Sequence, residues 1–130
     1  MEKVTLNNGE IELIEPQKIL YINFVGDIAE DDYKNIWSTG VDLGVEHKLD
    51  KFLFDQSNIG KVSFTARGWV ILKMLPRIKK DLGKGINVGI ISSKNMINKS
   101  GVSYLKSMFE KMAGLKITFY PDIDSAREGL

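Results

Sequence analysis

The sequence predicts a single α/β domain with a mixed β-sheet, in which an antiparallel N-terminal hairpin precedes parallel strands and packed helices. Three observations support this prediction. The 130 residues contain no linker, repeat or low-complexity segment, so residues 1–130 are expected to form one domain. Asn7-Asn8-Gly9 separates two short alternating segments, as in a hairpin. Apolar strand patterns then alternate with helix patterns, which implies right-handed parallel crossovers.

The first half of the chain predicts four strands and one helix. Hairpin strands at residues 3–6 and 10–14 flank the Asn-Gly turn, and Glu15-Pro16-Gln17 makes the next turn. The apolar run at residues 19–25 is typical of a buried strand, which Gly26-Asp27 ends. A helix at residues 29–45 begins with three acidic residues, where the helix dipole favours negative charge. Residues 51–54 form the fourth strand.

The second half predicts three helices and two strands. Thr65 caps a helix at residues 65–80, which Pro76 kinks or interrupts and which Gly83 and Gly85 follow. Strands are expected at residues 86–91 and 116–120, and helices at residues 99–113 and 123–129. Asp122 or Asp124 caps the last helix.

Composition excludes several classes of protein. The net charge of +1 provides no general attraction for nucleic acid, and no apolar run reaches the roughly 20 residues that a membrane span requires. Cysteine is absent, which excludes disulfides and thiolate sites and suits a reducing cytoplasm. The N-terminus lacks the apolar block of a signal peptide. We therefore expect a cytoplasmic protein that neither inserts into membranes nor binds nucleic acid.

The motifs that could indicate catalysis have structural explanations. The single histidine, His47, is expected in the last turn of the first helix, away from the carboxyl ends of the strands. Gly83-Lys84-Gly85 precedes a strand, whereas a phosphate-binding loop follows a strand and begins a helix. We therefore expect no catalytic residue, no metal and no cofactor.

Polar residues follow the predicted parallel strands, at the edge where α/β proteins usually bind ligands. They are Asp55, Gln56, Ser57, Ser92, Ser93 and Tyr120. Asp55 has two interpretations: it accepts hydrogen bonds from the following turn, or it orients a ligand or partner. An enzyme that uses Asp55 with a serine or tyrosine of this edge is the competing class of function.

The run from Trp69 to Leu75 is apolar nearly all the way round the expected helix, although a helix on a sheet needs one apolar stripe. The predicted loop at residues 56–64, with Phe64, covers the second side, or the helix forms a homodimer. The candidate partner or ligand surface thus adds Phe64, Thr65, Arg67, Trp69 and Leu72 to the residues of the strand ends.

The strand Leu53-Phe54-Asp55, the helix start Thr65-Ala66-Arg67-Gly68 and the strand at residues 86–91 resemble the STAS domain, and more closely its SpoIIAA-like bacterial group. The likeness extends from about residue 18 to the end. It implies a small α/β fold that acts by protein–protein contact. Members with a phosphorylation switch carry the modified serine where this chain has Arg67, and Ser57, Ser63 and Thr65 are only nearby hydroxyls.

These observations predict a non-enzymatic regulatory or binding module that contacts an unidentified protein partner and lacks the phosphorylation-switch serine. The alternative is a carrier or sensor of a small, lipid-like apolar ligand, because a lipid-binding branch is related to the same family. That alternative predicts an enclosed apolar cavity of roughly some hundreds of cubic ångströms.

Overall fold

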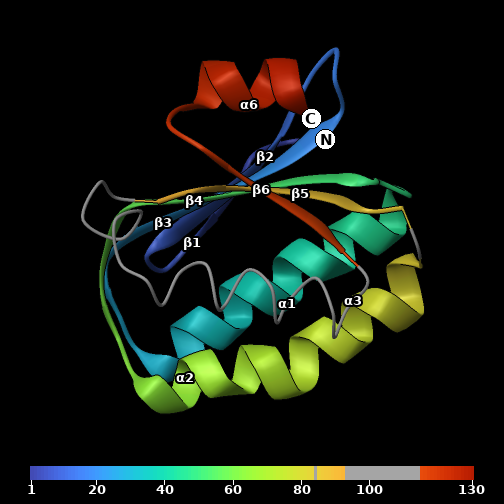
Figure 1. The fold of residues 1–130 in the computed structure, drawn as a ribbon. Coiled ribbons are helices and arrows are strands. Elements are labelled where there is room, and N and C mark those ends of the chain that lie inside the picture. The colour runs from blue at the N-terminus through green and yellow to red at the C-terminus, as the bar shows by residue number, and fades with distance from the viewer. Residues whose placement is uncertain (84, 93–114) are drawn as a thin grey trace.

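The computed structural model describes residues 1–83, 85–92 and 115–130 (Figure 1). A six-stranded sheet has the strand order β1-β2-β3-β4-β5-β6. The first two pairs are antiparallel and the last three are parallel. The strands are β1 (Val4–Leu6), β2 (Gly9–Ile14), β3 (Ile19–Ile28), β4 (Lys51–Val62), β5 (Asn87–Ile91) and β6 (Lys116–Tyr120). The predicted mixed sheet is confirmed.

The helices lie on both faces of the sheet but are unequally divided between them. One face carries α1 (Glu30–Glu46) and a continuous helical run of α2 (Phe64–Trp69), the π-helix η1 (Val70–Met74) and α3 (Leu75–Leu82) (Figure 1). The C-terminal helix α6 (Ile123–Gly129) lies on the opposite face. The helix predicted at residues 99–113 lies outside the described residues.

The parallel strands follow one another in the sheet in the order of the sequence. Such a sheet has no point at which the strand order reverses, and that reversal opens the usual ligand crevice of a doubly wound fold. The usual crevice of a doubly wound fold is therefore not formed by the described strands.

Strands β3 and β4 both run further than predicted. Gly26-Asp27 does not end β3, and residues 56–62 belong to β4 instead of a loop. The two extensions pair with each other across two register shifts, with Val25 opposite Asn58 and Ile28 opposite Val62. The polar, Gly-containing sequence hid this extension because cross-strand pairing, not apolar alternation, holds it in place.

The first hairpin turn consists of Asn7 and Asn8, and Asn8 has the left-handed φ of 60°. Gly9, assigned to the turn from sequence, is instead the first residue of β2 and pairs with Phe24. A Cβ at Gly9 would lie 2.8 Å from Cδ1 of Ile36. A side chain at this position would crowd Ile36, so glycine favours the close approach of α1 to the sheet.

The start and the middle of the second helical run also differ from expectation. Ser63, not Thr65, is the N-cap, and its Oγ accepts a hydrogen bond from the Ala66 N–H at 3.0 Å. The interruption expected at Pro76 takes the form of the π-turn η1 just before it. We attribute this wide turn to Pro76, because proline lacks an N–H and its ring clashes with the preceding turn of a regular α-helix.

The main core lies between the sheet and the helices of the first face. It is built around aromatic rings from two strands and α1: Trp37 stacks on Phe54 with ring centroids 4.4 Å apart, and Phe24 lies 5.6 Å from Tyr33. A smaller cluster under α6 contains Tyr21, Leu53 and Ala126. The remaining ends agree with prediction: His47 is the C-cap of α1, and Asp122 caps α6.

Candidate functional site

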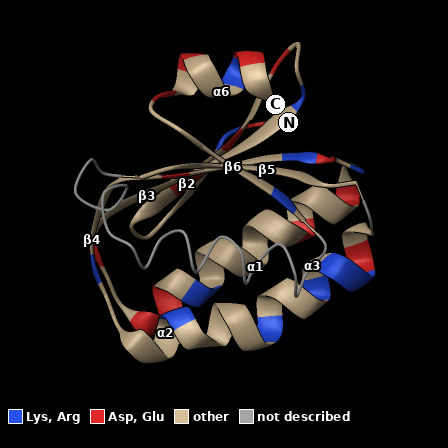
Figure 2. Ribbon diagram, viewed as in Figure 1, with Lys and Arg blue, Asp and Glu red and all other residues tan. Residues whose placement is uncertain are grey.

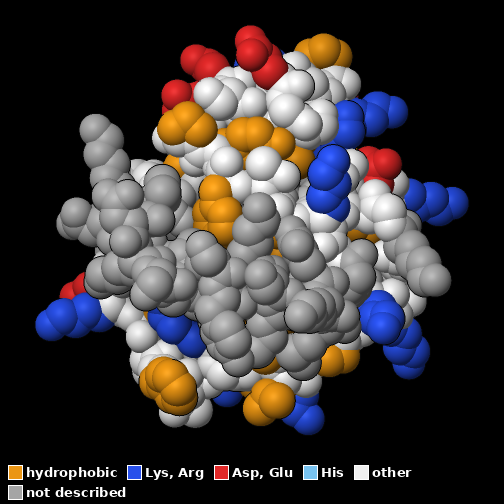
Figure 3. All heavy atoms as spheres, in the orientation of Figure 1, with side chains coloured by type: hydrophobic (Ala, Val, Ile, Leu, Met, Phe, Trp, Pro, Cys, Tyr) orange, Lys and Arg blue, Asp and Glu red, His pale blue; other side chains and the backbone are white. Residues whose placement is uncertain are grey.

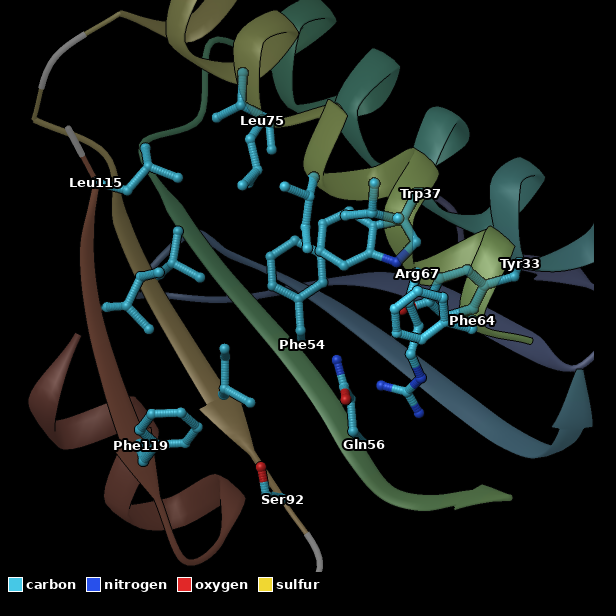
Figure 4. Close-up of a pocket in the computed structure, with 17 residues that line it drawn as sticks. Tyr33, Trp37, Phe54, Gln56, Phe64, Arg67, Leu75, Ser92, Leu115 and Phe119 are labelled. Atoms are coloured by element: carbon cyan, nitrogen blue, oxygen red, sulfur yellow. The ribbon is translucent and has the colours of Figure 1, made fainter. Parts of the chain in front are cut away.

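A pocket of about 270 Å³ lies between the helix-bearing face of the sheet and the α2–η1–α3 run (Figure 4). Its walls are apolar except at a few positions. The described residues that line it are Tyr33, Trp37, Phe54, Gln56, Phe64, Arg67, Gly68, Val70, Ile71, Leu75, Ile78, Val88, Ile90, Ser92, Leu115, Ile117 and Phe119.

The sheet wall of the pocket follows from the alternation of side chains along a strand. Phe54 and Gln56 of β4 face the pocket because they are two residues apart. Val88 and Ile90 of β5 line it for the same reason, and Ser92 follows at the same spacing. In β4 the polar Gln56 thus follows the apolar Phe54, and Ser92 follows Val88 and Ile90 just after β5, whereas β6 contributes only the apolar Ile117 and Phe119.

The polar groups of the pocket are gathered toward one region. Figure 4 shows Arg67 and Gln56 near Phe64, whereas Leu75 and Leu115 lie at the other end. Tyr33 and Trp37 extend into the same polar region from α1. The arrangement is a mainly apolar chamber with a few hydrogen-bonding groups on one side, as is usual for small-molecule sites.

Asp55 does not belong to this pocket. It points to the opposite face, where its Oδ2 accepts a hydrogen bond from the Tyr21 hydroxyl at 2.5 Å. Its Oδ1 accepts bonds from the Ser57 N–H at 3.0 Å and the Ser57 hydroxyl at 2.6 Å. Burial, followed by the hydrogen bond to Asp55, raises the pKa of Tyr21. Both carboxylate oxygens therefore accept hydrogen bonds from within the protein. This agrees with a structural role for Asp55, the first of the two interpretations from sequence.

Only some of the residues that the sequence assigned to a partner or ligand surface line the pocket. Gln56, Phe64, Arg67 and Ser92 line the pocket, and Ser93 lies outside the described residues. The other predicted residues do not line the pocket: Asp55, Ser57, Thr65, Trp69 and Leu72. Sequence reasoning missed the aromatic side chains of the walls, chiefly Tyr33, Trp37 and Phe54, because their helical and strand periodicity marked them only as core.

The sequence predicts that the loop at residues 56–64, with Phe64, covers the second side of the helix that follows, and this prediction is wrong. Residues 56–62 are part of the sheet, and the Phe64 side chain is 92% exposed, so neither covers the outer side of the helix. Leu72 is 71% exposed, whereas Val70 and Met74 are buried. The Lys34 ammonium lies 5.5 Å from the Trp69 ring centroid and partly covers that side chain. Leu72 and Phe64 remain uncovered by the described residues.

Charged side chains of both signs are mixed on the helices (Figure 2). Arg77, one of the basic residues after the π-turn, forms ion pairs with Asp42 and with Asp81. Within residues 1–83, 85–92 and 115–130, no helix is long and apolar enough to cross a bilayer.

The chain matches no protein-family model and no curated protein. It does match a solved structure of an uncharacterised DUF3478-family protein with a SpoIIAA-like fold from Shewanella loihica PV-4. The TM-score is 0.63 at 19% sequence identity, and the match covers 94% of this chain and 91% of that chain. The chain therefore has the SpoIIAA-like fold, as the resemblance predicted.

Proposed function

We propose that this protein is a non-enzymatic binding module whose pocket holds a small apolar ligand. The observation that carries this proposal is the apolar pocket of about 270 Å³ between the sheet and the α2–η1–α3 run. A cavity of about 150 Å³ with apolar walls is known to hold benzene, so this pocket has room for a ligand of about ten non-hydrogen atoms. This function corresponds to the carrier or sensor considered from sequence, and we expect it to operate in the cytoplasm.

The hydrogen bonding of Asp55 supports binding over catalysis. An enzyme built on Asp55 would need a carboxylate that is free to exchange protons with a substrate. Here Tyr21 and Ser57 occupy both oxygens on the face opposite to the pocket. The single histidine, at the end of α1, is not among the residues that line the pocket.

We expect the protein to bind 1-octanol, a neutral probe of about the right size, and the variant Ile90→Trp to lose at least tenfold in affinity. Ile90 is half-buried and lines the pocket, so the larger side chain would occupy the ligand's space. Isothermal titration calorimetry measures both affinities. Native mass spectrometry of the purified protein would also detect a ligand that is retained during purification.

Ile123→Trp is the matched control, because Ile123 is 37% exposed and lies on α6 at the opposite face. The control should bind 1-octanol as the unmodified protein does. Absence of 1-octanol binding, together with no retained ligand, would contradict the proposed function. Equal binding by Ile90→Trp would place the ligand elsewhere.

Protein–protein contact is the second candidate function, and the exposure of Phe64 and Leu72 favours it. Figure 3 shows hydrophobic side chains exposed as separate patches along the edge of the molecule where α2 lies in Figure 1. A contact surface usually exposes large apolar side chains, and Phe64 and Leu72 provide two of them on one helical run. The partner in the simplest form of this proposal is a second copy of the chain.

Leu72→Glu should convert such a dimer to a monomer and leave the fold intact, because Leu72 has little contact with its own chain. Burying an aliphatic side chain stabilises an interface by about 1.5–3 kcal/mol, which a buried carboxylate would remove. Sedimentation velocity would measure the mass of both proteins, with Lys73→Glu as a control for added negative charge on the same turn. If the unmodified protein and Leu72→Glu are both monomers, the dimer does not exist.

A further inference from the structure

The pocket contains a positive charge that no described group neutralises. Arg67 lies in its wall and is only partly exposed, and it forms no ion pair with any described residue. By contrast, Arg77, further along the same helical run, has two acidic partners. A guanidinium beside apolar walls interacts more strongly with an anion than one in water, because the surroundings screen its charge less.

A second feature of the same region is a buried hydrogen-bond donor that lacks a well-formed bond within the described residues. The Trp37 side chain is 8% exposed, and its buried Nε1–H makes no well-formed hydrogen bond within the described residues, although the Tyr33 hydroxyl lies near enough to interact with this donor. Figure 4 shows this nitrogen on the side of the indole that faces Arg67 and Tyr33. A buried donor without a well-formed hydrogen bond costs free energy, so an acceptor on a ligand in the pocket would stabilise it.

The Tyr33 hydroxyl reports the electrostatic character of the region. Burial raises its pKa, but the neighbouring Trp37 N–H and the charge of Arg67 both oppose that increase because they stabilise negative charge on the oxygen. The side-chain amide of Gln56, which lines the pocket from β4, provides a further N–H donor. Donors from α1, α2 and β4 therefore surround one region of an otherwise apolar pocket.

We propose that the ligand is an amphiphilic carboxylate, whose head interacts with Arg67, Trp37 Nε1–H and the Gln56 amide and whose hydrocarbon chain extends toward Leu75 and Leu115. This inference rests on the proposed ligand-binding function and adds the chemical class of the ligand. A planar carboxylate suits Arg67 because a guanidinium can donate two parallel hydrogen bonds to it. The pocket volume fits a chain about as long as that of octanoate, with about ten non-hydrogen atoms in total.

The test compares octanoate with 1-octanol, which has the same chain and no charge. The unmodified protein should bind octanoate at least tenfold more tightly than 1-octanol in calorimetric titrations. Arg67→Gln should remove this preference, because octanoate loses the positive charge that pairs with its carboxylate, whereas neutral 1-octanol has no charge that could lose a partner. Lys73→Gln, which removes one positive charge from an exposed position on the same helical run, should keep the full preference.

The Trp37 indole provides a readout that does not depend on overall charge. The chain has two tryptophans, and Trp69 does not line the pocket, so its indole N–H signal is an internal reference. In ¹H–¹⁵N NMR spectra, octanoate should shift the Trp37 signal downfield as its N–H gains an acceptor, and should leave the Trp69 signal in place. The variant Trp69→Phe assigns the two signals.

The outcomes separate this inference from the function on which it rests. The proposal of a carboxylate ligand is overturned if 1-octanol and octanoate bind equally well, or if Arg67→Gln keeps the preference for octanoate. The apolar binding site would remain in either case. If an alkyl phosphate of the same chain length is preferred by tenfold or more over octanoate, the head group is a phosphate and the carboxylate is again overturned. If none of these probes binds, the proposed function itself fails.

Discussion

Phe24→Ala is expected to lower the free energy of unfolding by about 3–5 kcal/mol, the range for removing a large aromatic side chain from a core. Phe24 is 0% exposed and lies against both Tyr33 and Trp37, with ring centroids 5.6 and 6.1 Å away. Its removal would leave a cavity between β3 and α1 that neither rigid ring can fill. Urea unfolding followed by circular dichroism measures the loss.

Phe64→Ala is the matched control because it removes the same side chain from a position that is 92% exposed. We expect a change of at most about 0.5 kcal/mol, as for most surface substitutions. A similar loss for the two variants would show that Phe64 is covered in solution, and a small loss for Phe24→Ala would contradict the described core.

Tyr21→Phe is expected to lower the free energy of unfolding by about 1–3 kcal/mol at pH 7, because it leaves a buried carboxylate oxygen without its donor. Asp55 is 5% exposed, and the Tyr21 hydroxyl is the only described donor to its Oδ2. Tyr120→Phe is the control, because it also removes a tyrosine hydroxyl, and Tyr120 is only half-buried. That variant should change stability by about 0.5 kcal/mol or less.

The same tyrosine should make stability depend on pH in alkaline solution. In the unfolded chain Tyr21 loses its proton near its ordinary pKa of 10.0, whereas burial and the bond to Asp55 raise its pKa in the folded protein. The folded state therefore binds more protons above about pH 10, so stability falls as the pH rises further. This contribution is fully present below pH 10.

Urea titrations between pH 8 and pH 11 should show a steeper alkaline loss in the unmodified protein than in Tyr21→Phe. A smaller loss remains in the variant, because burial also raises the pKa of Tyr33. Identical slopes in the two proteins would contradict the described hydrogen bond.

The sequence predicted the sheet and most of its helices because local pattern and topology agree in those parts of the chain. The apolar run that begins at Ile19 and the acidic first turn of α1 are local features, and they identify a strand and a helix without knowledge of their neighbours. The extension of β4 through residues 56–62 was missed because its partner is β3, some thirty residues earlier. No local pattern records that pairing.

The candidate site shows the same limit. Asp55, Gln56 and Ser57 are consecutive, and sequence alone assigned them to one surface. Alternation along β4 sends Asp55 to Tyr21 on one face and Gln56 to the pocket on the other. Which face carries the pocket depended on where the helices pack.

The chain itself thus determined the α/β class and the parallel strands, since both depend on periodicity and element order, and its resemblance to the SpoIIAA-like group implied the fold that the structure has. Only the tertiary structure decided that Tyr33 and Trp37 of α1 meet Arg67 of α2 across an apolar pocket. Tyr33 and Arg67 are more than thirty positions apart in the sequence. The pocket between them is space that the packing of the side chains leaves unfilled. Side-chain types along a sequence do not specify such a space, because it depends on how closely the helices approach the sheet.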